Sequence, residues 1–406
     1  MYIAILGYGV VGSGAAQVLS MNKDIILKNT GRDKVELKHI LDLRKFPGDV
    51  NESLVTDSFE KILNDPEVGV VIETMGGLHP AYEFVSSCLK AGKSVVTSNK
   101  ELVASKGDIL MKLAKENSVN FMFEASVGGG IPILRPITEC LAADKITEVA
   151  GILNGTTNYI LTKMFKEGVT FDDALLEAKR LGYAESDPTA DVDGLDACRK
   201  ICILAALCFG KHVYPDSVYT EGIRSITKAD VDYAEKMGGV IKLLGTAKLL
   251  ENGKITVSVS PVFISGSSQL SNVNDVFNAV LVRGNAVGDT VFYGRGAGKL
   301  PTASAVINDV ISCIRQPRGN ALSGWGDAEE GFVIPFEESR GSYFVRACTS
   351  KENISKVFGN VKFIECDLAP DDETAFITDE LLFGDICKKI DGLGCTVRSK
   401  IRITDY

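Results

Sequence analysis

The sequence contains few of the residues that most often transfer protons or bind metal ions. Only three histidines occur among 406 residues. His39 lies in a strand pattern and His212 follows a helix end, and in the sequence neither stands beside a cysteine or a cluster of carboxylates. A zinc site or a histidine-based catalytic triad is therefore not expected. Acid–base chemistry must come from lysines or carboxylates.

Signals for membranes, nucleic acids and disulfides are also lacking. No apolar run reaches the roughly 18 residues of a membrane-spanning helix. The net charge is -9 and no basic tract is present, which argues against nucleic acid as a partner. The ten cysteines form no Cys-x-x-Cys pair, and several occupy apolar helical positions. We therefore expect a cytoplasmic protein with reduced thiols that acts on a small molecule.

A glycine-rich turn stands near the start of the chain. Residues 2–6 predict a buried parallel strand, and Gly7-Tyr8-Gly9-Val10-Val11-Gly12 follows it and opens a helix. In this context Gly7 permits the tight turn, Gly9 lets a pyrophosphate approach the backbone, and Gly12 lets helix pack on strand. The helix N-terminus favours phosphate charge. We expect a dinucleotide cofactor here, with Val10 and Val11 beside it.

The second predicted strand, residues 36–41, ends in a charged run that bears on the choice of cofactor. Asp42 is suited to binding the adenosine ribose hydroxyls of NAD. Arg44 and Lys45 are suited to binding the 2′-phosphate of NADP. Both kinds of residue are present, so the sequence leaves NAD and NADP open.

A lysine follows another predicted strand of this domain. Residues 94–97 form the strand, and Ser98-Asn99-Lys100 come directly after it. Ligands bind at the carboxyl ends of parallel strands, which favours a position for Lys100 in the cleft. The alternative is a helix-start residue that faces water, although a cation is not favoured at a helix N-terminus.

The densest cluster of carboxylates lies in residues 180–210. Pro188 keeps the residue before it out of helical backbone, so residues 185–191 predict a loop. An apolar helix follows and ends near Gly210, with Asp193 as its expected N-cap. The helix places Asp196 and Lys200 on one face. They form either a solvated salt bridge, stabilising by about 0.3–0.5 kcal/mol, or a polar cleft that binds an ammonium group and holds a proton donor. The carboxylates are Glu185, Asp187, Asp191, Asp193 and Asp196.

This stretch resembles homoserine dehydrogenase. The family pattern Gly-Tyr-x-Glu-x-Asp-Pro, then Asp, then Gly-x-Asp-x-x-x-Lys, is present in full from Gly182 to Lys200. The resemblance covers roughly residues 1–320. It implies NAD(P)-dependent interconversion of L-aspartate 4-semialdehyde and L-homoserine, in the biosynthesis of threonine and methionine. It implies that Lys200 is the proton donor, with Lys100 the other candidate, and that the substrate contacts are Tyr183, Glu185, Asp191 and Asp196.

The same resemblance implies further contacts. Thr156, in the run Asn154-Gly155-Thr156-Thr157-Asn158, would lie beside the substrate. A monovalent cation, Na⁺ in this family, would be held mainly by backbone carbonyls of Glu124, Val127, Gly129 and Ile131. The family assembles as a homodimer through its substrate domain, and a homotetramer is the other expectation. The implied cofactor contacts are Thr74, Ser98, Lys100, Gly182 and Gly298.

The whole chain is expected to be α/β. We expect a Rossmann domain over residues 1–132 with a returning helix at 300–316, and a substrate and dimerisation domain over 133–299. Residues 317–339 predict a linker. The last segment, 340–406, has the order strand, helix, strand, strand, helix, strand, which is ferredoxin-like and resembles an ACT regulatory domain.

Two alternatives to this enzyme remain open at this stage. One is a Rossmann dehydrogenase of another amino acid, and the other is a non-catalytic, cofactor-sensing protein with an ACT module. Thr349-Ser350-Lys351-Glu352-Asn353 replaces the usual Gly-x-Leu segment of ACT domains. We therefore expect threonine to inhibit poorly.

Overall fold

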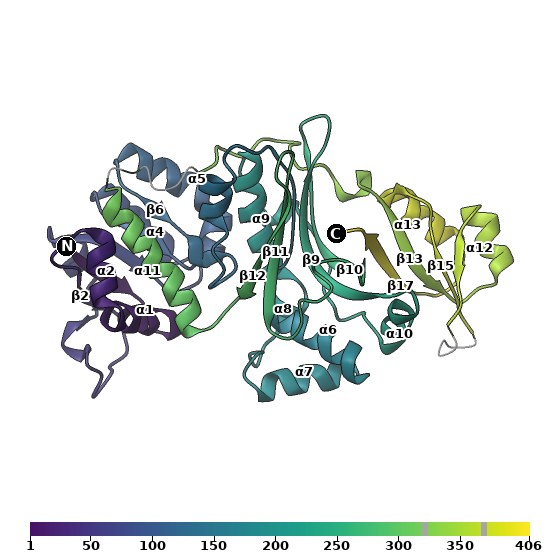
Figure 1. The fold of residues 1–406 in the computed structure, drawn as a ribbon, viewed down its shortest axis with the longest axis horizontal. Helices are drawn as coiled ribbons and strands as arrows, with labels where there is room; N and C mark the ends of the chain where they lie inside the picture. Colours follow the sequence, from purple (N-terminus) through teal and green to yellow (C-terminus); the bar gives the residue numbers. More distant parts are fainter. Residues whose placement is uncertain (318, 320–323, 367–371) are drawn as a thin grey trace. The chain divides into compact units, whose positions relative to one another are not determined.

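The protein is described here from a computed structural model, which covers residues 1–317, 319, 324–366 and 372–406. Figure 1 shows the ribbon coloured along the sequence. The chain forms two compact units, each assembled from three segments. Unit 1 comprises residues 1–145, 202–215 and 294–329, and unit 2 comprises residues 146–201, 216–293 and 330–406. The domain limits expected from the sequence stay a prediction.

Unit 1 contains a parallel sheet with strand order β3-β2-β1-β4-β5-β6. This is the order of doubly wound dinucleotide-binding sheets, in which ligands bind at the carboxyl ends of the strands where the order reverses, here between β1 and β4. The predicted Rossmann fold is confirmed. The strands are β1 Tyr2–Leu6, β2 Glu36–Leu41, β3 Val55–Thr56, β4 Val68–Glu73, β5 Ser94–Thr97 and β6 Phe121–Met122.

Helices cover this sheet, and one of them returns from late in the sequence. Helix α11, green in Figure 1, packs beside the purple helices α1 and α2. The approach is close because Gly14 of α1 has no side chain, and a Cβ there would lie 2.9 Å from the Lys299 carbonyl oxygen. The helices of this unit include α1 Val10–Met21, α2 Lys23–Thr30, α3 Phe59–Leu63, α4 Ala81–Lys90, α5 Lys100–Glu116 and α11 Lys299–Arg315.

Unit 2 is built on a second, mostly antiparallel sheet with the order β12-β11-β7-β9-β10-β17-β13-β15-β14. The predicted hairpin around Glu251-Asn252-Gly253 joins β9 and β10, which pair along eleven registered positions each. Its strands are β7 Ile146–Ile152, β8 Tyr219–Thr220, β9 Gly239–Leu249, β10 Ile255–Ser265, β11 Phe277–Gly284, β12 Gly288–Arg295, β13 Arg340–Ala347, β14 Lys362–Ile364, β15 Thr374–Ile377, β16 Leu381–Leu382 and β17 Val397–Thr404.

The helices of unit 2 carry the carboxylate-rich stretch. Apolar side chains of β7, β9, β10 and β11 form a buried core on one face of the sheet, and α6 packs against β9 and β11. The helices are α6 Gly155–Glu167, α7 Phe171–Arg180, α8 Thr189–Val192, α10 Lys228–Lys236, α12 Lys351–Phe358 and α13 Phe383–Gly392, together with α9 Leu195–Phe209, which continues into unit 1.

The C-terminal segment has the predicted order of elements, β13-α12-β14-β15-α13-β17, with the short β16 added. Its sheet is continuous with the rest of unit 2, because β17 pairs in parallel with β10. Tyr219 of β8 also packs edge-on against Phe383 of α13 at a ring-centroid distance of 5.4 Å. The segment therefore shares both a sheet and an aromatic core with the rest of unit 2. Its assignment as an ACT-like module stays a prediction.

Local expectations were wrong at several places. The apolar pattern of residues 120–124 predicts a strand over all five positions, but β6 ends at Met122, because the chain then turns into a 3-10 helix at Glu124–Ser126. The loop expected over residues 185–191 contains the start of α8, which begins directly after Pro188. Asp193 is not the N-cap of α9, which starts at Leu195; it forms an ion pair with Arg224 instead.

Two further expectations concern the linker and the membrane. The predicted linker over residues 317–339 includes positions 318 and 320–323, which lie outside the described residues, and it also contains a 3-10 turn at Phe336–Glu338. Within the described part of the chain, no helix combines the length and the apolar character that crossing a membrane requires. All ten cysteines are free thiols, as expected.

Candidate active site

The glycine-rich turn has the geometry of a phosphate-binding loop. Gly7 ends β1 with φ +91°, and a Cβ on Gly12 would lie 2.0 Å from the Gly7 carbonyl oxygen. A Cβ on Gly9, in contrast, would meet no protein atom within 4 Å. The glycine at position 9 therefore leaves open space above the start of α1, where Val10 is exposed and Val11 half-buried. Such a cradle fits a pyrophosphate.

Asp42 and Arg44 meet at the end of β2. The Asp42 carboxylate accepts hydrogen bonds from the Tyr8 amide (2.8 Å) and from Nε and Nη2 of Arg44 (2.9 and 2.8 Å). The Arg44 guanidinium holds the pKa of Asp42 well below its usual range, although partial burial acts in the opposite direction. The acid and the base named from the sequence thus pair with each other, and both sit where an adenosine ribose binds in this fold.

Thr74 follows β4 and contacts the glycine turn. Its hydroxyl donates to the carbonyl oxygens of Gly7 (2.7 Å) and Leu6 (3.3 Å). The side chain expected to touch the cofactor therefore also fixes the conformation of the loop that would hold the phosphates.

A buried carboxylate that the sequence analysis missed organises the ends of β4 and β5. Glu73 is fully buried and accepts hydrogen bonds from the Thr97 hydroxyl and the Met75 amide (2.8 Å). Burial raises its pKa, and these hydrogen bonds oppose the shift. The signal was present in the sequence as an acid at the carboxyl end of a buried strand.

The same network leads to Lys100. Asn99 donates from its amide Nδ2 to the Gly77 carbonyl (2.6 Å), and its Oδ1 accepts from the Leu102 amide (3.1 Å) as the N-cap of α5. Ser98 and Lys100 flank this asparagine, and Lys100 is the half-buried first residue of α5. The segment expected at the nicotinamide end is therefore anchored on the strand ends.

The turn with the expected cation-site residues packs on the returning segment. Gly129 has φ +55°, and a Cβ there would lie 2.4 Å from the Gly296 carbonyl oxygen. The Gly130 amide donates to the Arg295 carbonyl (3.0 Å). Gly298, with φ +118°, is the N-cap of α11. The absence of a side chain at Gly129 thus lets two segments that are distant in the sequence pack together.

Glu124 does not direct its carboxylate at this turn. The carboxylate accepts from the backbone amides of Ile133 (2.6 Å), Leu134 (2.8 Å) and Arg135 (3.0 Å). A cation would therefore meet the Glu124 backbone carbonyl, with those of Val127, Gly129 and Ile131. In the described part of the chain, no group of three or more His, Cys, Asp or Glu side chains is arranged to bind a metal ion.

In unit 2, Lys200 of the carboxylate-rich stretch is buried together with Asp196. The Lys200 ammonium donates to Asp196 Oδ2 (2.7 Å) and to the Leu153 carbonyl (2.7 Å). Only 11% of the lysine side chain and 7% of the Asp196 side chain are exposed. Of the two interpretations left open by the sequence, the solvated salt bridge is wrong. A buried ammonium needs compensating acceptors, and these two provide them.

A second carboxylate joins the pair through an asparagine. Asn154 Nδ2 donates to Asp191 Oδ1 (2.7 Å) and to Asp196 Oδ2 (2.8 Å). Burial raises the pKa of Asp191, and the hydrogen bond from Asn154 counteracts that effect. The structure thus brings together Asp191, Asp196 and Lys200, with a formal charge of about −1 when both acids are ionised.

The remaining substrate candidates lie at the start of α6 and in the loop between α7 and α8. The Thr156 hydroxyl donates to the Tyr183 carbonyl (2.6 Å), and the Tyr183 ring packs edge-on against Tyr159. Gly182 has φ +75°, which the turn after α7 requires. Glu185 is exposed in this loop. Thr156 and Tyr183 are therefore in contact, whereas Glu185 is not part of the buried cluster around Lys200.

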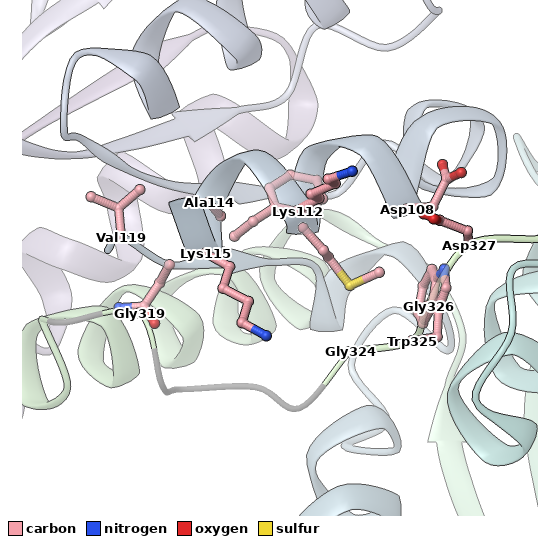
Figure 2. Close-up of a pocket in the computed structure, with 13 residues that line it drawn as sticks. Asp108, Lys112, Ala114, Lys115, Val119, Gly319, Gly324, Trp325, Gly326 and Asp327 are labelled. Carbon is pink, nitrogen blue, oxygen red and sulfur yellow. The ribbon is translucent and has the colours of Figure 1, made fainter. Parts of the chain in front are cut away.

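A cavity of about 640 Å³ in unit 1 is lined by none of the site residues named above (Figure 2). Asp108, Lys112 and Lys115 of α5 line it, together with Trp325. It also borders Phe121, the first residue of β6, and so opens near the amino end of that strand. Dinucleotides bind at the opposite, carboxyl ends, so this cavity is not the expected cofactor site.

The three histidines have local structural contacts. His39 hydrogen-bonds Asp65 (2.8 Å) and His79 hydrogen-bonds Glu83 (2.7 Å). Nδ1 of the buried His212 accepts from the Trp325 indole (2.9 Å), and burial lowers the pKa of His212. Each histidine thus has a local hydrogen-bond partner, and the assignment of the acid–base chemistry to lysines or carboxylates stays a prediction.

Two family models match the chain. One described as the NAD binding domain of homoserine dehydrogenase matches residues 7–124, and one described as homoserine dehydrogenase matches residues 132–311. Among curated relatives, the homoserine dehydrogenase of Bacillus subtilis is 43% identical over 329 residues, which cover 79% of this chain and 76% of the relative. That of Pseudomonas aeruginosa is 42% identical over 352 residues, covering 85% and 81%.

Solved structures agree with the sequence relatives. A homoserine dehydrogenase from Thiobacillus denitrificans has a TM-score of 0.91 and 36% identity, and the match covers 100% of this chain and 98% of that one. A hyperthermophilic archaeal homoserine dehydrogenase in complex with NADPH has a TM-score of 0.64 and 31% identity, covering 77% of this chain and 96% of that one.

Proposed function

The chain belongs to the homoserine dehydrogenase family, and on that premise we propose how its own residues perform the reaction. It is an NAD(P)-dependent oxidoreductase that interconverts L-aspartate 4-semialdehyde and L-homoserine in amino-acid biosynthesis. The alternatives of another amino-acid dehydrogenase or a cofactor-sensing protein are not favoured. Which residues carry the chemistry, and with which cofactor, is the subject of the proposal.

Lys200 is the proton donor to the substrate carbonyl oxygen. The single observation that carries this role is its burial against Asp196 and the Leu153 carbonyl. When bound, the dinucleotide supplies a hydride to the carbonyl carbon. Negative charge then develops on the carbonyl oxygen, where a positioned ammonium stabilises it and delivers a proton. In the reverse direction the neutral amine of Lys200 accepts the hydroxyl proton of homoserine.

The acids around Lys200 recognise the substrate ammonium. With Asp191 and Asp196 ionised, the cluster carries a net negative charge that complements a cation. Thr156 and Tyr183 form the adjoining wall, and the exposed Glu185 closes on the substrate from the loop between α7 and α8.

Unit 1 holds the dinucleotide. The open space at Gly9 and the uncapped start of α1 suit the pyrophosphate. Asp42 and Arg44 receive the adenosine ribose, with Asp42 favouring NAD and Arg44 favouring NADP. Thr74, Ser98 and Lys100 serve the nicotinamide end, with Gly182 and Gly298 allowing close approach. The second lysine, Lys100, is the other candidate for the proton donor.

We also propose a bound cation, a cellular location and an oligomeric state. A sodium ion would be held by the backbone carbonyls of Glu124, Val127, Gly129 and Ile131, where Gly128 and Gly129 turn the backbone. The chain acts in the cytoplasm, in keeping with its free thiols. It works as a homodimer or homotetramer, which light scattering of the purified protein measures directly.

The deciding experiment is steady-state oxidation of L-homoserine with NAD and, separately, NADP. We expect turnover with at least one of them, and none with the des-hydroxy analogue 2-aminobutyrate. Absence of turnover with homoserine and either dinucleotide, in protein shown to bind the dinucleotide, would favour the sensor instead.

A further inference from the structure

Asn154 stands where β7 passes into α6, at the edge of the Lys200 cluster. It is the N-cap of α6: its Oδ1 accepts from the Thr157 amide (2.9 Å) and also from the Thr157 hydroxyl (3.1 Å). The side chain is 5% exposed. One end of this amide is thus occupied by an ordinary capping interaction.

The other end of the amide bridges two acids from two different helices. A primary amide has two N–H donors, and those of Asn154 go to Asp191 of α8 and to Asp196 of α9. Asp196 Oδ2, which accepts from Asn154, also accepts from the Lys200 ammonium (2.7 Å). One carboxylate oxygen is therefore held from two sides, and the position of the ammonium depends on it.

The choice of residue at this N-cap is informative. Asparagine, aspartate and serine cap helices about equally well. Aspartate would add a third negative charge to the cluster, and a lysine or arginine would neutralise the charge that attracts the substrate. Asparagine is the capping residue that supplies two uncharged N–H donors.

We propose that Asn154 is a positioning residue for the reaction, one that holds Asp191 and Asp196 together so that Asp196 keeps the Lys200 ammonium in place. This role rests on the proposed function of Lys200 as proton donor. The charged groups that face Asn154 from the neighbouring helices are Asp191, Asp196 and Lys200. Without the amide donors, the two acids repel each other and Asp196 swings away from the lysine.

The test is Asn154→Asp, which keeps the capping acceptor and removes the donors. We expect kcat to fall about 10- to 150-fold, the effect of losing a hydrogen bond to a charged group. The added carboxylate raises the pKa of its neighbours, so the kcat–pH profile should move to higher pH. The dinucleotide Kd should stay close to that of the wild type, whereas the melting temperature should fall, because a third carboxylate is buried beside two others. The matched control is Thr170→Asp, at the N-cap of α7, for which we expect wild-type kcat and a wild-type kcat–pH profile.

A double variant separates geometry from charge. In Asn154→Asp/Asp191→Asn the donor and the acceptor of the 154–191 contact exchange places and the total charge returns to that of the wild type, but Asp196 still lacks the amide donor of Asn154. The kcat–pH profile should therefore return toward its wild-type position while kcat stays low. A double variant with wild-type kcat would overturn the inference.

Lys200→Ala, measured in parallel, distinguishes a failure of the positioning role of Asn154 from a failure of the donor role of Lys200. Wild-type kcat and pH profile in Asn154→Asp, together with loss of kcat in Lys200→Ala, overturns the positioning role alone. Wild-type kcat in Lys200→Ala overturns the donor assignment and the inference with it. If Asn154→Asp does not fold, Asn154→Ser keeps a cap and offers only one donor; a reduced kcat at wild-type melting temperature supports the role, and an unchanged kcat contradicts it.

Discussion

At the scale of single residues, the burial of Lys200 determines what its loss should do. Removing a positioned acid lowers a rate by about 10²–10⁴-fold, so we expect this range for kcat in Lys200→Ala. Dinucleotide binding should change little, because the glycine turn and its cofactor contacts belong to unit 1. Steady-state kinetics and a dinucleotide titration measure the two quantities.

A matched control for this variant exists in the same unit. Lys228 also pairs with a carboxylate four residues later, Asp232, at 3.2 Å, but 54% of its side chain is exposed. Lys228→Ala should keep wild-type kcat. Near-normal kcat in Lys200→Ala, combined with an inactive Lys100→Ala, would transfer the donor role to Lys100.

The pairing of Asp42 with Arg44 makes cofactor choice a matter of balance between two side chains. The pKa of Asp42 is held below its usual range, so this acid is ionised at every working pH and repels a 2′-phosphate. Asp42→Ala also frees Arg44 to bind that phosphate. We expect the NADP/NAD ratio of kcat/KM to rise in Asp42→Ala and to fall in Arg44→Ala. An unchanged ratio in both would mean that the ribose binds elsewhere.

Asp309 makes stability depend on pH in the direction opposite to an ordinary carboxylate. It is fully buried on α11 near Glu124, and burial together with the Glu124 charge raises its pKa to about 8. The folded state therefore holds a proton that the unfolded state releases near pH 4. The unfolding free energy from this group is largest below about pH 4 and decreases as pH rises toward 8.

Replacing Asp309 by its neutral isostere removes this dependence. In Asp309→Asn the slope of melting temperature between pH 6 and pH 9 should be smaller than in the wild type, and the variant should gain most at the alkaline end. Thermal melts across that range test the point. Equal slopes in both proteins would show that Asp309 is ionised in the native state.

At the scale of elements, the glycine turn before α1 separates binding from folding. A Cβ at Gly9 meets no protein atom, and the residue has φ −80°, so alanine fits the backbone. A Cβ at Gly12 would collide with the Gly7 carbonyl at 2.0 Å. We expect Gly9→Ala to weaken dinucleotide binding at an unchanged melting temperature. Gly12→Ala should lower both the dinucleotide affinity and the melting temperature. Fluorescence titration and calorimetry measure these two quantities. Equal melting temperatures for the two variants would contradict this account.

Elements with a strong local pattern could be predicted from the sequence, and contacts between distant segments could not. The glycine turn, the β9–β10 hairpin and α11 follow from spacing and turn residues within a few positions. The pairing of Asp42 with Arg44 is also local, but the choice of partner depends on rotamers that spacing does not specify. Asp193 failed as an N-cap because Arg224, 31 residues away, takes its carboxylate.

The candidate site shows the same division. The Asp196–Lys200 pair was visible because one helical turn separates the two residues. Asn154 and Glu73 were missed as site residues because their partners come from other strands and helices, up to 42 residues away for Asn154. From the sequence, Asn154 was only part of the run around Thr156, and both its cap role and its bridging amide emerged only once α6, α8 and α9 were placed.

At the scale of the whole molecule, a buried ion network joins the C-terminal segment, residues 340–406, to the rest of unit 2. Arg346 of β13 donates to Asp230 Oδ1 (2.8 Å) at the start of α10 and to Glu373 Oε1 and Oε2 (2.9 and 2.8 Å). All three side chains are at most 3% exposed. With the β10–β17 pairing, this network makes the segment part of the fold of unit 2. It argues for a structural role and against a detachable regulatory domain.

Arg346→Ala tests whether the segment is structural. Removing one partner of a buried network leaves uncompensated charges and costs about 3–5 kcal/mol of unfolding free energy. We therefore expect Arg346→Ala to unfold in a single transition at a lower temperature than the wild type. Its activity should be lost over the same temperature range. Lys388→Ala is the control, because that side chain is 81% exposed and its ion pair with Asp385 should contribute at most about 1 kcal/mol. A regulatory module would behave otherwise: Arg346→Ala would keep the stability of the remaining chain, and threonine at submillimolar concentration would inhibit the wild type cooperatively. The altered segment at Thr349–Asn353, whose Asn353 amide is already bonded to Thr349 and to the Leu393 carbonyl, leads us to expect neither.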